Sequence, residues 1–383
     1  EFLVHLEREL DLVAPHIDDD RQVRQVHLGG GTPTFLTPGQ IDHLMRLLHV
    51  RFHFADDAEI GLEADPRSLE PADLRALKET GFNRLSMGVQ DLDPAVQAAV
   101  NRVHDIACVA GLLGAAHGVG FDSISVDLIY GLPLQTTEAF ARTIEHIIAM
   151  NPDRISLFNY AHMPDRFKAQ RKIRAEDLPS PATKLALFRN SLNRLIDAGY
   201  EFIGMDHFAR PDDDLARARR AGTMTRNFQG YSTHGGLDLL AFGPSAISQV
   251  GDAFAQNHRA LPDWQTDVAS GRLPVARGRI RSVDDRLRAE IITEIMCSGE
   301  IRYRRFERDY DLRFESYFAG ALAALDPLIA DGLVERFDGG VRGSSDGLLF
   351  LRAIAMPFDV YLRSAAGQTG PASDRMTSYS RIV

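Results

Sequence analysis

The sequence predicts an α/β fold, in which a partial (β/α)6 barrel of parallel strands precedes a smaller, mostly helical domain. Two observations support this fold class. Short apolar runs alternate with longer helical patterns over residues 26–205, and repeated βα units at such spacing form parallel strands with right-handed crossovers. Five of these runs in succession end in polar side chains, which are costly to bury without partners. Because parallel barrels gather such side chains at the C-terminal ends of their strands, a barrel fits better than a doubly wound sheet.

The first residues predict an amphipathic helix, because Leu3, Leu6, Leu10 and Val13 recur at helical spacing. This helix is already running at Glu1, with no initiator Met and no capping residue before it. We therefore expect the chain to lack residues that precede Glu1 in the native protein.

Strands and helices are then expected in alternation. The predicted strands are Val26–Leu28, Glu59–Leu62, Arg84–Val89, Ser123–Ile129, Arg154–Phe158 and Phe202–Met205. The predicted helices are Pro38–His49, Pro71–Thr80, Asp105–His117, Thr137–Met150 and Pro181–Ala198. The polar strand ends are Glu63–Pro66, Gln90–Asp91, Asp127 with Tyr130, Asn159–His162 and Asp206–His207.

The C-terminal third predicts a second domain. Residues 1–262 are assigned to the barrel and its extension, and this part includes a functional loop region near residues 222–247, rich in Gly, Thr, Asn and Gln. Residues 263–283 are predicted to be a linker, and residues 284–383 a helical, winged-helix-like domain that serves as a lid or docking surface. Its expected elements are helices at Asp284–Ser298, Phe306–Tyr310 and Glu315–Asp331, then a hairpin of Leu333–Phe337 and Leu348–Leu351 around Gly339-Gly340.

The composition argues against several function classes. Forty-three basic and fifty-three acidic side chains give a formal charge of −10, which on average repels nucleic acids and anionic membranes. No uncharged apolar run reaches the length of about 18 residues that spans a membrane. We expect a cytoplasmic protein with neither nucleic acid nor membrane as a partner. Cys108 and Cys297 are interpreted as buried small hydrophobic residues in helices, so no metal ligand is predicted.

Gly29-Gly30-Gly31-Thr32-Pro33-Thr34 directly follows the first predicted strand. Three glycines let a ligand approach the backbone closely, and exposed N–H groups there bind a carboxylate or a phosphate. The spacing is not that of a Walker or Rossmann loop. Taken alone, the segment is equally consistent with a tight strand-to-loop turn.

A strand that ends in Gly-Gly-Gly-Thr-Pro resembles the second barrel strand of radical SAM enzymes, and later motifs narrow this resemblance. The chain is similar to the oxygen-independent coproporphyrinogen III oxidases from end to end, and less so to their sister group, the heme chaperones. The matching segments are Glu63–Pro66, Asn83–Gln90, Val100–Arg102, Asp127–Pro133, Phe158–His162, Gly204–Ala209, Asn227–Tyr231, Gly243–Ser248 and Ser380–Val383.

The resemblance implies a radical SAM barrel that lacks its first strand, and two bound molecules of S-adenosylmethionine (SAM). Positions matching those around the SAM that coordinates the family's iron–sulfur cluster are Gly30, Glu63 and Ile247. Positions matching those around the second SAM are Gly31, Thr32, Gln90, Arg102, Asp127 and Ala161. Gln229 matches a position near the reacting centre and is the candidate catalytic residue.

The implied reaction is the oxidative decarboxylation of coproporphyrinogen III to protoporphyrinogen IX in heme biosynthesis, by a monomer that receives electrons from a flavodoxin or ferredoxin system. The substrate's carboxylates need cationic partners, for which the candidates by location are Arg166, Arg171, Arg210 and Arg226. Tyr160 and His162 either serve the site or pack beneath it. Asp206 and His207 form either an acid–base pair or a structural hydrogen bond.

The family holds its 4Fe-4S cluster with a short cysteine motif, and this sequence has no such motif. We expect the cluster ligands to precede Glu1, and the chain by itself to be inactive. Two alternatives stay open, namely a heme chaperone-like protein and a non-catalytic relative that binds a tetrapyrrole or SAM.

Overall fold

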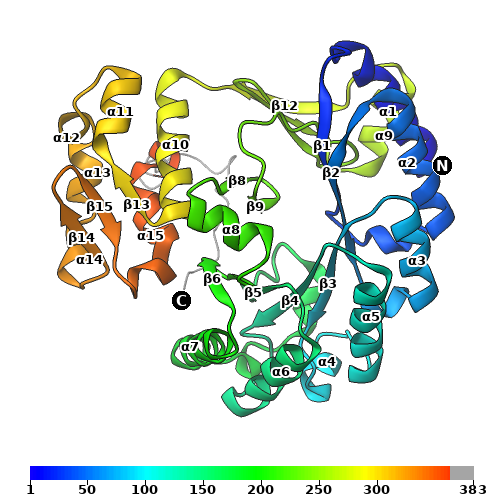
Figure 1. Ribbon diagram of the computed structural model, residues 1–383, viewed down its shortest axis with the longest axis horizontal. Coiled ribbons are helices and arrows are strands. Elements are labelled where there is room, and N and C mark those ends of the chain that lie inside the picture. Colours follow the sequence, from blue (N-terminus) through cyan, green and yellow to red (C-terminus); the bar gives the residue numbers. More distant parts are fainter. Residues whose placement is uncertain (363–383) are drawn as a thin grey trace. The chain divides into compact units, whose positions relative to one another are not determined.

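The computed structural model describes residues 1–362 (Figure 1). Contacts between residues divide the chain into two compact units. The first, here called the sheet unit, comprises Val23–Arg46 and Phe54–Arg217. The second, here called the flanking unit, comprises Glu1–Gln22, Leu47–His53 and the described residues from 218 onward. The predicted domain boundaries at 262 and 284 stay a prediction.

The sheet unit holds the predicted alternation of strands and helices. Its strands are β1 (Gln22–Leu28), β2 (His53–Ala64), β3 (Arg84–Gln90), β4 (Ser123–Tyr130), β5 (Arg154–Asn159), β6 (Glu201–Gly204) and β7 (His207–Ala209). Its helices are α2 (Pro38–Arg51), α3 (Pro71–Glu79), α4 (Pro94–Ala99), α5 (Ile106–Val119), α6 (Thr137–Met150), α7 (Pro181–Asp197) and α8 (Asp214–Ala221). Together they form the curled half-barrel of the predicted fold class, with the strand order β1-β2-β3-β4-β5-β7-β6 (Figure 1).

The sixth predicted strand does not lie beside the fifth, which corrects one expectation. Strands β2 to β5 pair in parallel, but β7 pairs antiparallel with both β5 and β6 and separates them. The cause is a tight turn at Met205, whose φ of 54° reverses the chain directly after β6. The returning strand then pairs with β5, and the Asp206 carbonyl accepts a hydrogen bond of 2.7 Å from the Leu157 N–H.

The helices begin and end where the sequence supplies capping groups. Asp93, Asp105, Thr136 and Ser180 each accept a backbone N–H of the first turn through the side chain. Helix α5 ends at Gly120, which has the left-handed conformation that glycine tolerates best. Cys108 is exposed on α5, contrary to prediction, because that helix turns Val109, Leu112, Leu113 and Ala116 towards the core instead.

The flanking unit combines the first helix with the C-terminal elements. Its strands are β8 (Thr225–Asn227), β9 (Gly230–Ser232), β10 (Ile247–Val250), β11 (Ala253–Asn257), β12 (Val275–Ile280), β13 (Glu300–Arg302), β14 (Val334–Phe337) and β15 (Gly340–Gly343). Its helices are α1 (Phe2–Val13), α9 (Leu261–Ala269), α10 (Val283–Ser298), α11 (Tyr303–Tyr310), α12 (Phe314–Tyr317), α13 (Ala319–Ala323), α14 (Asp326–Ala330) and α15 (Leu351–Ala355).

The segment predicted as a linker, residues 263–283, is ordered structure. It contains most of α9 and all of β12, which pairs antiparallel with β11. Trp264 on α9 is fully buried and anchors the segment. Its indole packs near Phe2 of α1, with ring centroids 5.5 Å apart.

The C-terminal elements are helical and carry a small sheet, as predicted, but two details differ. Residues predicted as one helix, Glu315–Asp331, form most of three short helices, α12, α13 and α14. The hairpin partner of β14 is β15 and not Leu348–Leu351, which lies in a 3-10 turn and the start of α15. Sequence patterns miss β15 because it is held by close packing: a Cβ on Gly340 would lie 2.4 Å from the Ile301 carbonyl oxygen and 2.3 Å from the Phe337 ring.

A buried carboxylate ties α1 to the rest of the flanking unit. Glu9 is 2% exposed, and three donors from distant parts of the chain converge on it. They are the Gly243 N–H at 2.8 Å, the Asn257 amide at 2.6 Å and the Trp264 indole N–H at 3.0 Å. These bonds fix the segment that leads into Ile247 and β10.

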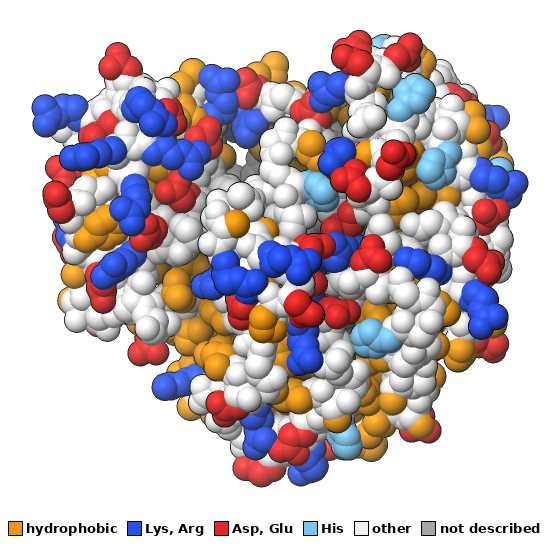
Figure 2. All heavy atoms as spheres, in the orientation of Figure 1, with side chains coloured by type: hydrophobic (Ala, Val, Ile, Leu, Met, Phe, Trp, Pro, Cys, Tyr) orange, Lys and Arg blue, Asp and Glu red, His pale blue; other side chains and the backbone are white. Residues whose placement is uncertain are grey.

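On the face drawn in Figure 2, acidic and basic side chains interleave over the surface. Among the described residues, no helix is long and apolar enough to cross a membrane.

Candidate cofactor-binding site

The inner face of the half-barrel is polar, because side chains alternate along each strand. In β3, Leu85, Met87 and Val89 are buried on one face, while Ser86, Gly88 and Gln90 occupy the other. The parallel register places equivalent positions of neighbouring strands side by side. Across the sheet, Glu63 of β2 lies opposite Ser86 of β3. The next row across β3, β4, β5 and β7 is formed by Gly88, Asp127, Ser156 and His207.

Glu63 lies at the end of β2, against the glycine loop. Its carboxylate makes a 3.0 Å hydrogen bond with the His27 ring and accepts the Gly30 N–H at 3.3 Å. The bond with His27 is the main cause that lowers the pKa of Glu63. Gly29 makes this approach possible, since a Cβ there would lie 2.5 Å from His27 Nε2 and 2.6 Å from Glu63 Oε1. The glycine loop is therefore shaped around a carboxylate that stays ionised.

Asp127 is the second carboxylate, on β4. It accepts a 2.9 Å hydrogen bond from the Ser86 hydroxyl. Burial raises the pKa of Asp127, and hydrogen bonds from Ser86 and Ser156 act against this rise. The negative charge of Glu63 raises the pKa further, so the two carboxylates lie near enough to affect each other.

Gln90 and Arg102 meet at Gly88. A Cβ on Gly88 would lie 2.8 Å from the Gln90 amide nitrogen and 3.5 Å from the Arg102 guanidinium. Arg102 donates to the Gly88 carbonyl and to Asp65, both at 3.1 Å. Gln90 has a φ of 69°, which is uncommon for a residue other than glycine.

Two polar atoms of this pair are buried without a protein partner among the described residues: Gln90 Oε1, which needs a donor, and Arg102 Nε, which needs an acceptor. Burial also lowers the pKa of Arg102. Unsatisfied buried polar groups are costly and rare. Their presence beside two carboxylates suits a ligand that brings both donors and acceptors.

A buried network that sequence reasoning missed supports the loop after β4. The Gln135 amide oxygen accepts the Gly131 N–H at 2.6 Å and the Leu132 N–H at 3.0 Å. Its amide nitrogen donates to Asp91 at 2.6 Å, and the Thr143 hydroxyl donates to Asp91 at 2.7 Å. Asp91 is 2% exposed. Asp91 is one of the predicted polar strand ends, but the sequence does not reveal this role, and no pattern distinguishes Gln135.

The structure gathers the predicted residues of the sheet unit at one edge. Glu63, Gln90, Arg102 and Asp127 lie around the end of β3, as described above. Gly31 and Thr32 lie exposed in the glycine loop beside Gly30, and Ala161 follows β5, where its carbonyl accepts from the Gln170 amide at 3.0 Å. Ile247 starts β10, and Gln229 is exposed in the turn between β8 and β9, where its N–H donates to Asn227 at 2.8 Å. These last two belong to the flanking unit and are described only within it.

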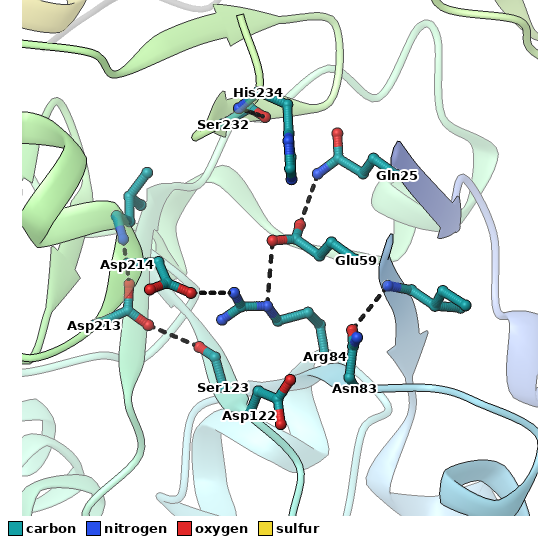
Figure 3. A network of polar contacts seen from close by, with 12 residues as sticks. Gln25, Glu59, Asn83, Arg84, Asp122, Ser123, Asp213, Asp214, Ser232 and His234 are labelled. Carbon is teal, nitrogen blue, oxygen red and sulfur yellow. Dashed lines mark hydrogen bonds and ion pairs between the residues drawn. The ribbon is translucent and has the colours of Figure 1, made fainter. Parts of the chain in front are cut away.

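The opposite edge of the sheet carries a network of paired charges (Figure 3). Arg84, at the start of β3, lies between Glu59 at 3.2 Å and Asp214 at 2.6 Å. Asp213 accepts from Arg154 and from the Ser123 hydroxyl, each at 2.9 Å. Arg210, a candidate carboxylate partner, lies at this edge, because the antiparallel β7 returns the chain there and its N–H donates to the Asp153 carbonyl. The position does not suit a ligand at the other edge.

The remaining predicted side chains show local partners. Asp206 makes a 2.7 Å hydrogen bond with the His207 ring. The Tyr160 hydroxyl lies 3.3 Å from the His162 ring nitrogen. Arg171 donates to the Pro164 carbonyl, and Arg226 stacks over the Tyr231 ring at 5.5 Å. None of these contacts assigns proton transfer.

Comparisons with known proteins cover both units. The Radical SAM superfamily model matches residues 4–147, and the HemN C-terminal domain model matches residues 282–350. The oxygen-independent coproporphyrinogen III oxidase of Escherichia coli K12 is 46% identical over 383 residues, which cover 100% of this chain and 82% of that protein. Its counterpart from Pseudomonas aeruginosa is 46% identical over 95% of this chain and 79% of that protein. A solved structure of the Escherichia coli coproporphyrinogen III oxidase (HemN), a radical SAM enzyme, superposes with a TM-score of 0.91 at 48% identity, covering 94% of this chain and 83% of that one.

Proposed function

This chain belongs to the oxygen-independent coproporphyrinogen III oxidases of the radical SAM superfamily, and we propose that it binds SAM at the C-terminal edge of its sheet for the conversion of coproporphyrinogen III to protoporphyrinogen IX. The observation that carries the proposal is the convergence of Glu63, Gln90, Arg102 and Asp127 around the end of β3, with Gln90 Oε1 and Arg102 Nε lacking partners. In the family's reaction, two propionate side chains lose CO2 and become vinyl groups.

The residues of this edge fit SAM. Its methionyl part carries an ammonium and a carboxylate, and its ribose carries two hydroxyls. Glu63 and Asp127 accept hydrogen bonds from ammonium or hydroxyl groups, while Arg102 pairs with a carboxylate. Gln90 supplies both a donor and an acceptor. When bound, SAM is the source of the hydrogen-abstracting group in this class of enzyme.

The 4Fe-4S cluster of the family does not fit the residues of this sequence. Such clusters are held by cysteine thiolates, and the sequence has two cysteines, one on α5 and one on α10. The described residues contain no group of three or more His, Cys, Asp or Glu side chains that could hold a metal ion. Burial raises the pKa of Cys297 to about 11, which disfavours the thiolate further.

The chain's own residues are positioned to bind and orient a ligand at this edge. Arg102 is positioned by Asp65 and the Gly88 carbonyl, so its guanidinium is directed before a ligand arrives. The Asp91–Gln135 network holds the Gly131–Leu132 turn in one conformation. Glu63 remains ionised because its pKa is lowered, which suits a cationic ligand.

The finer features of the proposal follow from the family resemblance. They are two SAM molecules, with Gly30, Glu63 and Ile247 around one and Gly31, Thr32, Gln90, Arg102, Asp127 and Ala161 around the other. Gln229 acts near the reacting centre. The protein is a cytoplasmic monomer that takes electrons from a flavodoxin or ferredoxin and uses neither nucleic acid nor membrane.

The test is equilibrium binding of SAM to the full chain by calorimetry, a readout that requires no cluster. We expect Arg102→Met to weaken SAM binding at least tenfold, the factor of one charge-assisted hydrogen bond. The matched control is Arg75→Met, an exposed arginine on α3. Unchanged binding by Arg102→Met would refute the assignment of this edge. In a preparation that contains the reduced cluster, lack of anaerobic CO2 release from coproporphyrinogen III would refute the activity.

A further inference from the structure

Lys184 is a cation in an energetically poor position. It lies in the first turn of α7, where the partial positive charge of the helix N-terminus disfavours a cation. The side chain is half-buried, and burial lowers the pKa of its ammonium with no carboxylate to offset the change. Each of these features costs stability.

The side chain is nevertheless directed to the C-terminal edge of the sheet. Its ammonium donates to the Tyr160 carbonyl, directly after β5, at a long 3.4 Å. Its aliphatic stem crosses Gly131, directly after β4, where a Cβ would lie 2.9 Å from Lys184 Cε. The absence of a side chain at Gly131 therefore makes room for the lysine.

Donor capacity remains at this ammonium. A lysine ammonium has three donors, and one weak bond to a carbonyl occupies a single donor. A half-buried ammonium with free donors beside the candidate site is suited to a carboxylate, the anion for which charge-assisted bonds are strongest.

We propose that Lys184 binds a carboxylate of the ligand held at the C-terminal edge of the sheet. The inference rests on the proposed function, which supplies two sources of that carboxylate: a propionate of the tetrapyrrole or the methionyl carboxylate of SAM. The unfavourable placement of Lys184 is then explained by ligand binding, since stability alone would select a neutral residue there.

The test compares Lys184→Met, Lys184→Arg and the parent chain. Methionine keeps the stem over Gly131 and removes the charge, while arginine keeps the charge. The matched control is Lys78→Met on α3, whose ammonium lies 3.7 Å from Asp122. The probes are coproporphyrin III, its uncharged tetraamide and SAM, titrated by porphyrin fluorescence and calorimetry.

We expect Lys184→Met to raise the Kd of coproporphyrin III about tenfold, as loss of one charge-assisted hydrogen bond does. Lys184→Arg keeps the charge and should lose less affinity than Lys184→Met, and binding of the uncharged tetraamide should not change. A tenfold loss confined to SAM would also support the proposal and assign the carboxylate to the methionyl group. Unchanged affinity for both ligands, or an equal loss for the tetraamide, would overturn it. A parent chain that binds coproporphyrin III but not SAM would refute the proposed function and leave the lysine comparison valid.

Discussion

Replacing the buried carboxylate of Glu9 should destabilise the flanking unit. In Glu9→Gln, the amide oxygen can still accept from Gly243 and Trp264, but the new NH2 group then faces the donor of Asn257. One charge-assisted hydrogen bond is lost and two become neutral, so the free energy of unfolding should fall by ~2 kcal/mol. For a unit of this size the midpoint of thermal unfolding should fall by about 4–8 °C.

The assay follows from the same geometry. Trp264 is the single tryptophan of the chain and donates to Glu9, so its fluorescence reports unfolding of the unit in which the change is made. The matched control is Glu7→Gln on the same helix, whose carboxylate is partly exposed and lies 3.3 Å from Arg51. Ion pairs that water reaches contribute little, so the control should shift the midpoint by less than about 2 °C. Equal effects of the two substitutions would refute the reasoning.

The loss of stability caused by Glu9→Gln should depend on pH, and the direction of this dependence can be measured. Burial raises the pKa of Glu9 in the folded protein above its ordinary value of 4.5. The folded state therefore binds the proton more readily than the unfolded state, and the wild type gains stability relative to Glu9→Gln as pH falls from 7 towards 4.5. The destabilisation by Glu9→Gln should grow over that range. A destabilisation that shrinks instead would mean that hydrogen bonding outweighs burial and lowers the pKa.

Two further predictions concern the sheet unit. Asp91→Asn should lower the free energy of unfolding by ~2 kcal/mol, because its new NH2 group would face the Gln135 donor. Unfolding followed by far-UV circular dichroism measures the change, with the exposed Asp122→Asn as control. An equal effect of both substitutions would contradict the network. Gly29→Ala should weaken SAM binding at least tenfold with little change in helix content, because its Cβ would displace the Glu63 side chain. The control is Gly111→Ala, where a Cβ meets nothing within 4 Å. Unchanged SAM affinity in Gly29→Ala would show that Glu63 does not belong to the site.

The sequence predicted the half-barrel because its determinants are local. Apolar runs, helix caps and glycine turns depend on neighbouring residues, and the polar strand ends identify Glu63, Gln90 and Asp127 from the sequence alone. Strand β7 was missed because it has only three residues and depends on a turn in which Met205, a residue that rarely has a positive φ, has a φ of 54°. β15 was missed because Gly340–Gly343 carries little apolar surface, and its pairing is decided by close contact with Ile301 and Phe337.

The supporting residues of the site were missed for another reason. Gln135 lies before α6 and Thr143 lies on it. Polar residues at such positions have no distinctive pattern in the sequence, and only the fold brings both to Asp91. Lys184 likewise looks like an ordinary helix lysine in the sequence. Its orientation over Gly131 becomes visible only when α7 packs against the ends of β4 and β5, as the Tyr130–Phe188 ring contact of 5.4 Å shows.

The two edges of the sheet differ in how their charges are satisfied, and this difference separates structural from functional groups. At the edge where the strands begin, Glu59, Asp213 and Asp214 each meet an arginine. At the edge where they end, Glu63 and Asp127 meet hydroxyls, a backbone N–H and an imidazole instead. The arginine–carboxylate pairs at the first edge are complete without a ligand. The carboxylates at the second edge lack an arginine or lysine partner, so a cationic ligand stabilises them further when it binds. Bound SAM should therefore stabilise the sheet unit more than the flanking unit, and hydrogen exchange with and without SAM would measure the difference at β2, β3 and β4.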